Sequence, residues 1–392
     1  MIGEVLHHLS GDAIVGIIAF QVVVLLIVFS NAAVLVRPTR GRAAAPKPLV
    51  SLLVPARDEA ASIRACVRSL LTQTYPHLEI LVLDDRSEDD TRRILEEERA
   101  RDARLVVLAG EEPPPDWTGK NWACHQLSLA ARGDVLLFAD ADTVFVAPQA
   151  VSQIVGALQA SRADLLSGLP KQVLRTLGET LIVPLFYWAF FSFTPLAAGL
   201  LRRGAAHARA VGQLMAFRRE AYDAIGGHAA VRGSVVDDLD LAKRVTGAGL
   251  TCRILDATAI VHCRMYRGGR EAVAGFGKNL FAAFGYAILP YAFVWGWLAF
   301  AHLEPIAIWG LHLALPTRVP AEPALLATTI TLSSIHWVFT YTRLRLPIWP
   351  ALVYPLTFVA FLVVAVRSFV DATGSRARWK GRRVARPPTR WI

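Results

Sequence analysis

Charged residues and cysteines are scarce in this chain of 392 residues. Only 19% of the residues are charged while 54% are hydrophobic, a balance that excludes an intrinsically disordered chain. No two of the four cysteines have the CxxC spacing, so the sequence predicts no zinc site and fits a reducing compartment. Because the mean hydropathy of +0.40 is too high for an ordinary soluble enzyme, we expect part of the chain to lie in a lipid bilayer.

The N-terminal region carries the first candidate membrane segment. Residues 13–36 contain no charged residue and exceed the ~20 residues that span a bilayer. Residues 1–12 contain no Lys or Arg, which argues against a cleaved signal peptide. Basic residues such as Arg37 and Arg40 follow the segment, and basic flanks stay in the cytosol. We therefore predict that residues 1–37 form an anchor whose N-terminus lies outside.

Further apolar runs begin at residue 280, and residues 280–368 are predicted to form three or four membrane helices. The basic tail is expected in the cytosol, and only an even number of C-terminal spans brings the chain back there, which favours four helices. With four helices, Arg343 and Arg345 would lie on the outer side of the membrane. Residues 369–392 form a strongly basic tail, and we expect this tail to contact anionic lipid headgroups in the cytosol. The four apolar runs are 280–301, 306–315, 325–341 and 348–366.

Residues 38–279 have the composition of a globular domain and alternate apolar runs with amphipathic stretches. This alternation is typical of an α/β fold with a mostly parallel sheet, in which ligands bind at the carboxyl ends of the strands. Residues 181–201 are apolar enough to resemble a span, but insertion would move the later motifs across the membrane. We predict an interfacial segment there, with a buried core helix as the alternative. The predicted strands are 49–54, 78–83, 105–108 and 135–138, and the predicted helices are 60–73, 91–100, 121–131 and 148–160.

Two acidic motifs follow predicted strands directly. Asp84 and Asp85 come after one strand, and Asp140 and Asp142 come after another. Two carboxylates separated by one residue can bind a hard divalent cation such as Mg²⁺ or Mn²⁺ and leave coordination positions for phosphate oxygens and water. The alternative is structural, because an aspartate between a strand and a helix is a common N-cap.

A third acidic cluster, Asp237, Asp238 and Asp240, occurs where a helix is predicted to begin. The helix dipole favours acidic residues at this end, which is the structural explanation. Repulsion among three carboxylates is nevertheless a cost that a purely structural helix start need not carry. The cluster is therefore a candidate for acid–base chemistry.

Eight motifs occur in order along the chain: VPARDEA at 54–60, LDDRSED at 83–89, WTGKNWACHQL at 117–127, FADADT at 138–143, GQLMAFRREAYDAIGGH at 212–228, DDLDLAKR at 237–244, RMYRGGRE at 264–271 and WKGRR at 379–383. Together they resemble the motifs of family 2 glycosyltransferases. Within that family they are similar to membrane enzymes that glycosylate carotenoids, of the chlorobactene and diaponeurosporenoate types, and to hopanoid-associated glycosyltransferases. The resemblance implies a GT-A, Rossmann-like α/β catalytic domain with a mostly parallel central sheet, flanked by transmembrane helices.

The resemblance also implies a role for each matching residue. It makes Asp238 the general base, with Asp237 beside it, and Asp142 the direct metal ligand together with Asp140. Gln213 and Trp122 would lie on the acceptor side. The residues implied in donor binding are Pro55, Ala56, Glu59, Asp84 or Asp85, Lys120, Asp140, Arg264 and Arg267, with Lys120 and Arg267 on the phosphate oxygens.

The activity implied is an inverting transfer of a hexose from a nucleotide sugar, with UDP-glucose as the first choice, to the hydroxyl of a membrane lipid such as a carotenoid. A divalent cation, Mg²⁺ or Mn²⁺, would assist, and the catalytic domain would face the cytosol at the cell membrane. Other acceptors remain open: a hopanoid, a glycerolipid or a polyprenyl phosphate.

Two other kinds of protein are alternatives to this activity. The family's usual Gln-x-x-Arg-Trp is only partly matched at Arg264–Arg267, which argues against a processive polysaccharide synthase. A non-catalytic membrane receptor or transporter component would not need the carboxylates at Asp140, Asp142 and Asp238. Nucleic acid is not an expected partner, because the basic residues flank membrane segments.

Overall fold

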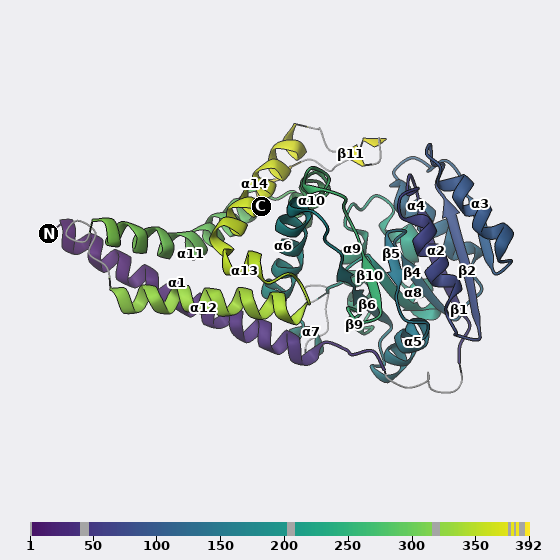
Figure 1. The fold of residues 1–392 in the computed structure, drawn as a ribbon, viewed down its shortest axis with the longest axis horizontal. Helices are drawn as coiled ribbons and strands as arrows, with labels where there is room; N and C mark the ends of the chain where they lie inside the picture. Colours follow the sequence, from purple (N-terminus) through teal and green to yellow (C-terminus); the bar gives the residue numbers. More distant parts are fainter. Residues whose placement is uncertain are drawn as a thin grey trace.

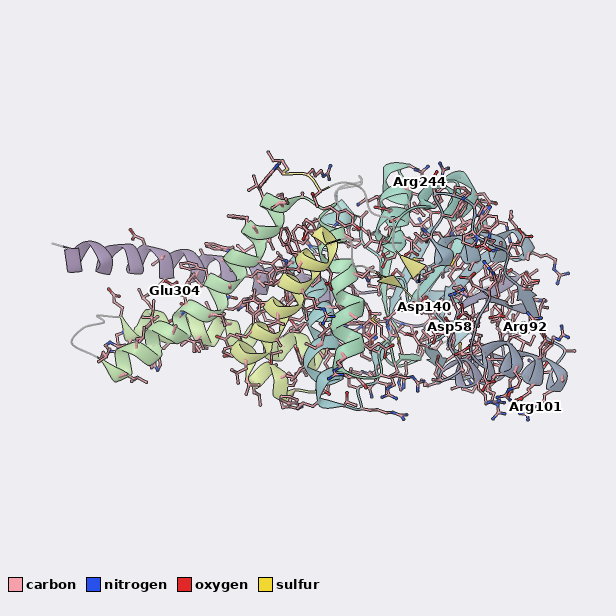
Figure 2. All side chains as sticks on the ribbon, turned by 90° about the horizontal axis from the view of Figure 1, so that it is seen from above. Asp58, Arg92, Arg101, Asp140, Arg244 and Glu304 are labelled. Carbon is pink, nitrogen blue, oxygen red and sulfur yellow. The ribbon has the colours of Figure 1, made fainter. Side chains whose placement is uncertain are left out.

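The computed structural model consists of an α/β domain and a bundle of long helices that extends away from it (Figure 1). The N-terminus lies at the far end of the bundle. Arg92 and Arg101 lie at the outer side of the α/β domain, Asp140 lies nearer its junction with the bundle, and Glu304 lies in the bundle (Figure 2). The structure describes residues 2–39, 47–201, 208–315, 322–374, 378–379, 382–383 and 389–392.

The α/β domain is built on a sheet that has seven strands among the described residues, in the order β3-β2-β1-β4-β8-β6-β9. Neighbouring strands are parallel, except that β8 is antiparallel to β4 and β6. The mostly parallel sheet predicted from the sequence is therefore confirmed. The strands are β1 (Val50–Ala56), β2 (Leu78–Asp84), β3 (Leu105–Ala109), β4 (Val135–Ala139), β6 (Leu165–Leu169), β8 (Leu214–Arg218) and β9 (Cys252–Asp256).

Helices cover both faces of this sheet, which is why its central strands are continuous apolar runs. Successive side chains of β1 point to opposite faces: Leu52 packs with α2, α3 and α5, whereas Leu53 packs with α4, α8 and α9. The helices are α2 (Ile63–Leu71), α3 (Thr91–Arg101), α5 (Ala150–Ala160), α4 (Gly119–Ala130), α8 (Arg219–Ala224) and α9 (Asp237–Gly247), with a 3₁₀ helix at Gly227–Val231.

A smaller sheet, in the order β5-β10-β7, lies beside the main sheet and completes the domain next to the bundle. Two of its strands adjoin motif residues: β5 continues from the Asp140–Asp142 loop, and β10 leads to Arg264. The strands are β5 (Thr143–Phe145), β7 (Lys171–Gln172) and β10 (Val261–Cys263), and a separate two-stranded pair is formed by β11 (Arg378–Trp379) and β12 (Arg382–Arg383).

The bundle is formed by long apolar helices from both ends of the chain. α1, α11 and α12 run side by side away from the α/β domain, and α14 packs on α10 and α11 (Figure 1). In the described part of the chain, three helical segments are long and apolar enough to cross a membrane: Asp12–Val34, Ile288–Ala314 and Tyr354–Thr373. The helices are α1 (Ile2–Val34), α10 (Gly269–Ala283), α11 (Ile288–Ala314), α12 (Pro323–Arg343), α13 (Trp349–Leu352) and α14 (Tyr354–Thr373).

The structure corrects the expected path of the C-terminal helices. The apolar run 306–315 does not form a helix of its own but continues α11, which carries Pro305 in its interior. Because this removes one reversal of direction, α12 ends at the α/β domain, where Arg343 Nη1 lies 2.6 Å from Asp256 Oδ2. Arg343 therefore lies on the side of the α/β domain, and the expectation that it lies on the opposite side was wrong.

The apolar segment 181–201 forms most of α6 (Leu177–Phe193) together with α7 (Ala198–Leu201). On one face of α6, Trp188 is fully buried against the long helices, as a buried core helix would be. The position of the segment relative to a bilayer stays a prediction. Arg40 and ten residues of the basic tail (375–377, 380–381 and 384–388) lie outside the described residues.

Candidate functional site

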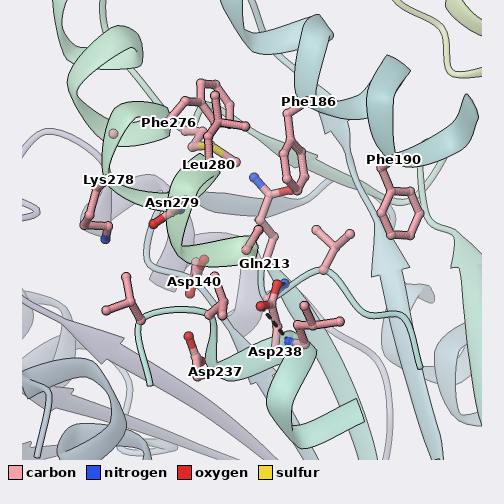
Figure 3. A pocket seen from close by; sticks show the side chains of 18 of the residues that line it. Asp140, Phe186, Phe190, Gln213, Asp237, Asp238, Phe276, Lys278, Asn279 and Leu280 are labelled. Carbon is pink, nitrogen blue, oxygen red and sulfur yellow. Dashed lines mark hydrogen bonds between the residues drawn. The ribbon is translucent and has the colours of Figure 1, made fainter. Parts of the chain in front are cut away.

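A cavity of about 1130 Å³ extends from the carboxyl edge of the main sheet into the bundle of long helices. Its polar half is lined by the ends of β1 and β4, the start of α9 and part of α10. Its apolar half is lined by aromatic side chains of α1, α6, α11 and α14. Figure 3 shows both halves, with Asp140, Asp237 and Asp238 on one side and Phe186 and Phe190 on the other. The predicted site residues are therefore largely brought together.

The ends of β1 and β2 form one wall of the polar half. Pro55, Ala56 and Glu59, which the resemblance assigned to donor binding, all line the cavity. Of the two aspartates that the sequence left open, Asp85 lines the cavity. Asp84 is not among the lining residues, and its carboxylate accepts a backbone N–H three residues further on at 3.2 Å. Asp84 therefore closes a local turn and does not cap a helix, because α3 begins at Thr91 with Asp90 at its N-cap position.

Arg57 is a cavity residue to which sequence reasoning gave no role. Its side chain is buried, and Nη1 donates to the carbonyl oxygens of Asp85 at 2.7 Å and Arg86 at 3.2 Å. These hydrogen bonds hold the segment after β2 against the end of β1. Its position inside the VPARDEA motif is the feature of the sequence that could have identified Arg57 as a site residue.

The loop after β4 gathers negative charge. Lys120 Nζ lies 2.9 Å from Asp140 Oδ1, and Cys263 Sγ donates to Asp142 Oδ1 at 3.3 Å. Burial, and then the nearby carboxylates of Asp140 and Glu59, raise the pKa of Asp142 to about 7. Asp142 is thus buried beside two other carboxylates, and both effects disfavour its charged form.

This set of oxygen donors fits a divalent cation. In the described part of the chain, no group of three or more His, Cys, Asp or Glu side chains could hold a metal alone. Mg²⁺ is commonly bound by one or two carboxylates together with substrate phosphates and water, so two aspartates suffice. A cation at Asp140 and Asp142 would also relieve the repulsion that raises the pKa of Asp142.

Asp238 lies in the first turn of α9 and faces the cavity. Its Oδ2 accepts the N–H of Gly212 at 2.8 Å, and its Oδ1 accepts the N–H of Leu239 at 2.8 Å. Burial, and then the neighbouring Asp237, raise the pKa of Asp238 to about 7. A carboxylate with this pKa is suited to accept a proton near neutral pH. Asp240, by contrast, is held by Lys243 within the helix at 2.9 Å.

The two arginines of the RMYR motif line the cavity, but their guanidinium groups are held by protein. Arg264 Nη2 donates to Oε1 of the fully buried Glu179 at 2.9 Å. Arg267 donates through Nη2 to the carbonyl oxygen of Ala61. In this arrangement Arg264 links α6 to the loop after β10, and its contact with the donor stays a prediction.

The two residues predicted on the acceptor side differ in position. Gln213 lines the cavity and is fixed there, because its Nε2 donates to Cys263 Sγ at 2.9 Å and its Oε1 accepts from Tyr187 and Gln172. Trp122 is not among the lining residues, and its indole packs 5.0 Å from the ring of Trp117. The role of Trp122 on the acceptor side stays a prediction.

Sequence reasoning also missed residues that only the tertiary fold brings to the cavity. Lys278 on α10 points into its polar half, and the wall of the apolar half is built by Phe186, Phe190 and residues of α11. Lys278 belongs to none of the motifs, so the sequence held no local signal for it. The aromatic residues of α6 were recognised only as part of the segment 181–201, which was predicted to lie at the membrane interface.

Comparison with known proteins agrees with this geometry. Residues 51–226 match the sequence profile of the family described as Glycosyl transferase family 2. The chain is 24% identical over 346 residues to the 4,4'-diaponeurosporenoate glycosyltransferase of Staphylococcus aureus (strain USA300), an alignment that covers 85% of this chain and 87% of that protein.

The fold has a relative among solved structures. The mannosyltransferase PcManGT from Pyrobaculum calidifontis, solved in complex with GDP-Man and Mn²⁺, superimposes with a TM-score of 0.57 at 20% identity. The match covers 92% of this chain and 99% of that one, so it extends over the α/β domain and the bundle together.

Proposed function

Since residues 51–226 are a family 2 glycosyltransferase domain with the GT-A fold, the chain is a glycosyltransferase, and we propose that its acceptor is a membrane lipid. It moves a hexose from a nucleotide sugar, with UDP-glucose as the first donor to test, to the hydroxyl group of that lipid. The configuration of the sugar carbon is inverted.

The observation that carries this proposal is the continuity of the cavity. Its polar half holds the carboxylates that suit a sugar diphosphate and a cation, and its apolar half opens among the long helices. A water-soluble donor and a hydrocarbon-bearing acceptor can therefore meet at Asp238 without either leaving its own medium. The similarity to a diaponeurosporenoate glycosyltransferase supports an acceptor of the carotenoid type.

The residues of the polar half divide the chemistry among them. Asp140 and Asp142 would hold a divalent cation, which when bound would offset the negative charge on the leaving diphosphate. Asp238 takes the proton from the acceptor hydroxyl as the oxygen attacks the sugar carbon from the face opposite the diphosphate. Lys120, held 2.9 Å from Asp140, adds positive charge beside the leaving group.

The same proposal includes an orientation in the membrane. α1 and α11 carry long apolar segments, and the return of α12 to the α/β domain leaves that domain on one side of the bundle. Basic residues beside α1 and α12, such as Arg37 and Arg343, favour the cytosol for that side. The enzyme is then a multi-pass protein of the cell membrane with a cytosolic catalytic domain.

The test uses the full-length protein in lipid nanodiscs with UDP-glucose, Mn²⁺ and a hydroxylated carotenoid. We expect a glucosylated carotenoid by mass spectrometry and inversion of the sugar carbon by NMR. Asp238→Asn should lower transfer by at least about 10²-fold while the protein still binds UDP. Asp90→Asn, at an exposed carboxylate before α3, serves as the control.

Two results would count against the proposal. If the Asp238→Asn variant transferred sugar at the wild-type rate, Asp238 could not be the general base. If the protein turned over no nucleotide sugar in the presence of a divalent cation, the proposed transferase activity would be contradicted. If the protein turns over the donor but does not glycosylate the carotenoid, another lipid is the acceptor. Mass spectrometry of lipid extracts from cells with and without the protein then distinguishes hopanoid, glycerolipid and polyprenyl phosphate acceptors.

A further inference from the structure

Asn279 is a polar residue of the cavity that belongs to none of the glycosyltransferase motifs. It lies in the second half of α10, the helix that runs from the RMYR loop toward α11, and it lines the cavity. In Figure 3 its side chain lies on the side of the cavity that holds Asp140, whereas Phe276 of the same helix stacks on Phe186 with 5.6 Å between the ring centroids. Asn279 therefore lies at the boundary between the polar and the apolar half.

The side-chain amide of Asn279 has an oxygen that the protein does not use. Oδ1 is shielded from solvent, yet it accepts no hydrogen bond from any residue that the structure describes. A buried acceptor without a donor is destabilising, and asparagine is also a poor residue for the interior of a helix. Neither packing nor helix propensity therefore explains an asparagine at this position.

The surroundings of Asn279 allow a ligand to supply the missing donor. The residue one turn further along α10, Ala283, is exposed, lines the cavity and carries only a methyl group. The last torsion of an asparagine side chain is broad, so the amide can turn its oxygen toward a group that enters the cavity. A carboxamide oxygen only accepts hydrogen bonds, so that group must carry an O–H or an N–H.

The chemistry of the proposed reaction narrows this donor to a sugar hydroxyl. An ionised diphosphate offers only accepting oxygens, and the acceptor hydroxyl gives its proton to Asp238. The hexose carries several O–H groups and must lie between the diphosphate at Asp140 and the base at Asp238, both of which line the cavity together with Asn279. On this basis we propose that Oδ1 of Asn279 accepts a hydrogen bond from a hydroxyl group of the transferred hexose and helps to select the donor sugar. This proposal rests on the proposed function.

The test compares ligands with and without the hexose. The full-length protein in nanodiscs is titrated with UDP-glucose and with UDP, each with Mn²⁺ and without an acceptor; GDP-mannose and GDP are titrated in parallel. Asn279→Leu keeps the approximate size of the side chain but not its oxygen. It should weaken binding of the nucleotide sugar by about 5- to 50-fold and leave the affinities for the nucleoside diphosphate and for Mn²⁺ unchanged.

Two further variants show whether the loss comes from the missing oxygen. Asn279→Asp keeps an accepting oxygen, so the ratio of the affinities for UDP-glucose and UDP should stay close to the wild-type ratio. Arg270→Met, at an exposed residue of α10 that does not line the cavity, should change neither affinity.

Deoxy analogues of the donor identify the hydroxyl group. The series consists of UDP-glucose without the hydroxyl at C2, C3, C4 or C6. The analogue that lacks the contacted hydroxyl should bind the wild type about as weakly as UDP-glucose binds Asn279→Leu, and the substitution should weaken that analogue no further. If Asn279→Leu weakens all four analogues as much as it weakens UDP-glucose, Asn279 contacts none of these hydroxyl groups and the proposal is wrong.

The other outcomes separate this proposal from the one on which it rests. Unchanged affinity for the nucleotide sugar in Asn279→Leu overturns the role of Asn279. An equal loss for UDP-glucose and UDP, or a loss of Mn²⁺ affinity, also overturns it, because the residue would then act on the nucleotide, the cation or the fold. Each of these results leaves the proposed transferase intact. A wild-type protein that binds none of the four ligands overturns both proposals.

Discussion

At the scale of single residues, the site is dominated by carboxylates that are buried close to one another. Asp142 and Asp238 lie on different elements, yet burial together with a neighbouring aspartate raises the pKa of each to about 7. The two groups differ in their contacts, because Asp238 accepts two backbone N–H groups whereas Asp142 accepts from the thiol of Cys263. Backbone donors fix Asp238 in place for a proton transfer, and the thiol leaves Asp142 available to a cation.

Asp142→Asn tests this division of roles. We expect the variant to lose most of its Mn²⁺ affinity in the presence of UDP and to lose about 10²–10³-fold in transfer rate, because one of two carboxylate ligands is gone. Manganese binding is measured by electron paramagnetic resonance. Asp90→Asn is again the control, and a variant with wild-type Mn²⁺ affinity would exclude Asp142 as a ligand.

Single residues also mark where sequence reasoning reached its limit. Asp140 and Asp142 were predictable because they follow a strand, and the ends of parallel strands meet at one edge, whereas the sequence left open whether Asp84 or Asp85 faces the site. Arg264 was assigned to the donor because its motif is local, but its partner Glu179 lies 85 residues earlier in the chain. Lys278 reaches the cavity only through the packing of α10, which no short motif records.

At the scale of elements, the pair Arg264–Glu179 joins the loop after β10 to the start of α6. Thr176 caps α6, and Glu179 in its first turn accepts from Arg264 at 2.9 Å and from the N–H of Arg175 at 2.8 Å. Although burial acts to raise the pKa of Glu179, these hydrogen bonds lower it below its usual value. The carboxylate is therefore charged and fully buried, and it depends on its partners.

Arg264→Met separates a structural role from donor binding. We expect a loss of about 3 kcal/mol in stability, because a buried carboxylate is left without its cation. The double variant Arg264→Met/Glu179→Gln should recover much of that loss, and thermal unfolding measures both. A variant of normal stability that binds UDP weakly would instead support the donor contact predicted from the sequence.

A second contact between elements, that of α2 with α3, predicts that the stability of the protein depends on pH. Glu98 is buried and accepts from Arg64 at 2.6 Å and from Arg68 at 3.0 Å. The hydrogen bonds from Arg68 are the largest cause that lowers the pKa of Glu98. Because the folded pKa is depressed, the stabilisation is present above the unfolded pKa of about 4.3 and is lost as pH falls through the lower folded value.

Glu98→Gln should therefore destabilise the protein by about 1–3 kcal/mol at pH 7, and the deficit should shrink as the pH falls below about 4. Unfolding curves of wild type and variant across this range measure the difference. Glu97→Gln is a matched control on the same helix, because the half-exposed Glu97 should matter by less than about 1 kcal/mol. A deficit that does not change with pH would mean that lost packing, not lost charge, is responsible.

At the scale of the whole molecule, the separation into a catalytic domain and membrane helices was predictable from hydropathy, but the path of the helices was not. Hydropathy divided 280–315 into two runs, whereas the structure extends α11 through Pro305. The end of α12 is fixed by an ion pair between Arg343 and Asp256, residues 87 apart in the chain, which no window of the sequence contains. The cavity between the two parts follows from that docking.

This architecture predicts that donor and acceptor binding can be altered separately. Phe190 on α6 forms part of the aromatic wall (Figure 3), and Phe190→Asn replaces an apolar contact with an amide. We expect the KM for the lipid acceptor to rise by about 10- to 100-fold, the equivalent of a buried phenylalanine, while UDP affinity stays unchanged. Leu356→Ala, at an exposed apolar residue of α14 outside the cavity, should leave both unchanged. Equal losses of acceptor and UDP binding in Phe190→Asn would contradict a cavity that holds the two substrates in separate halves.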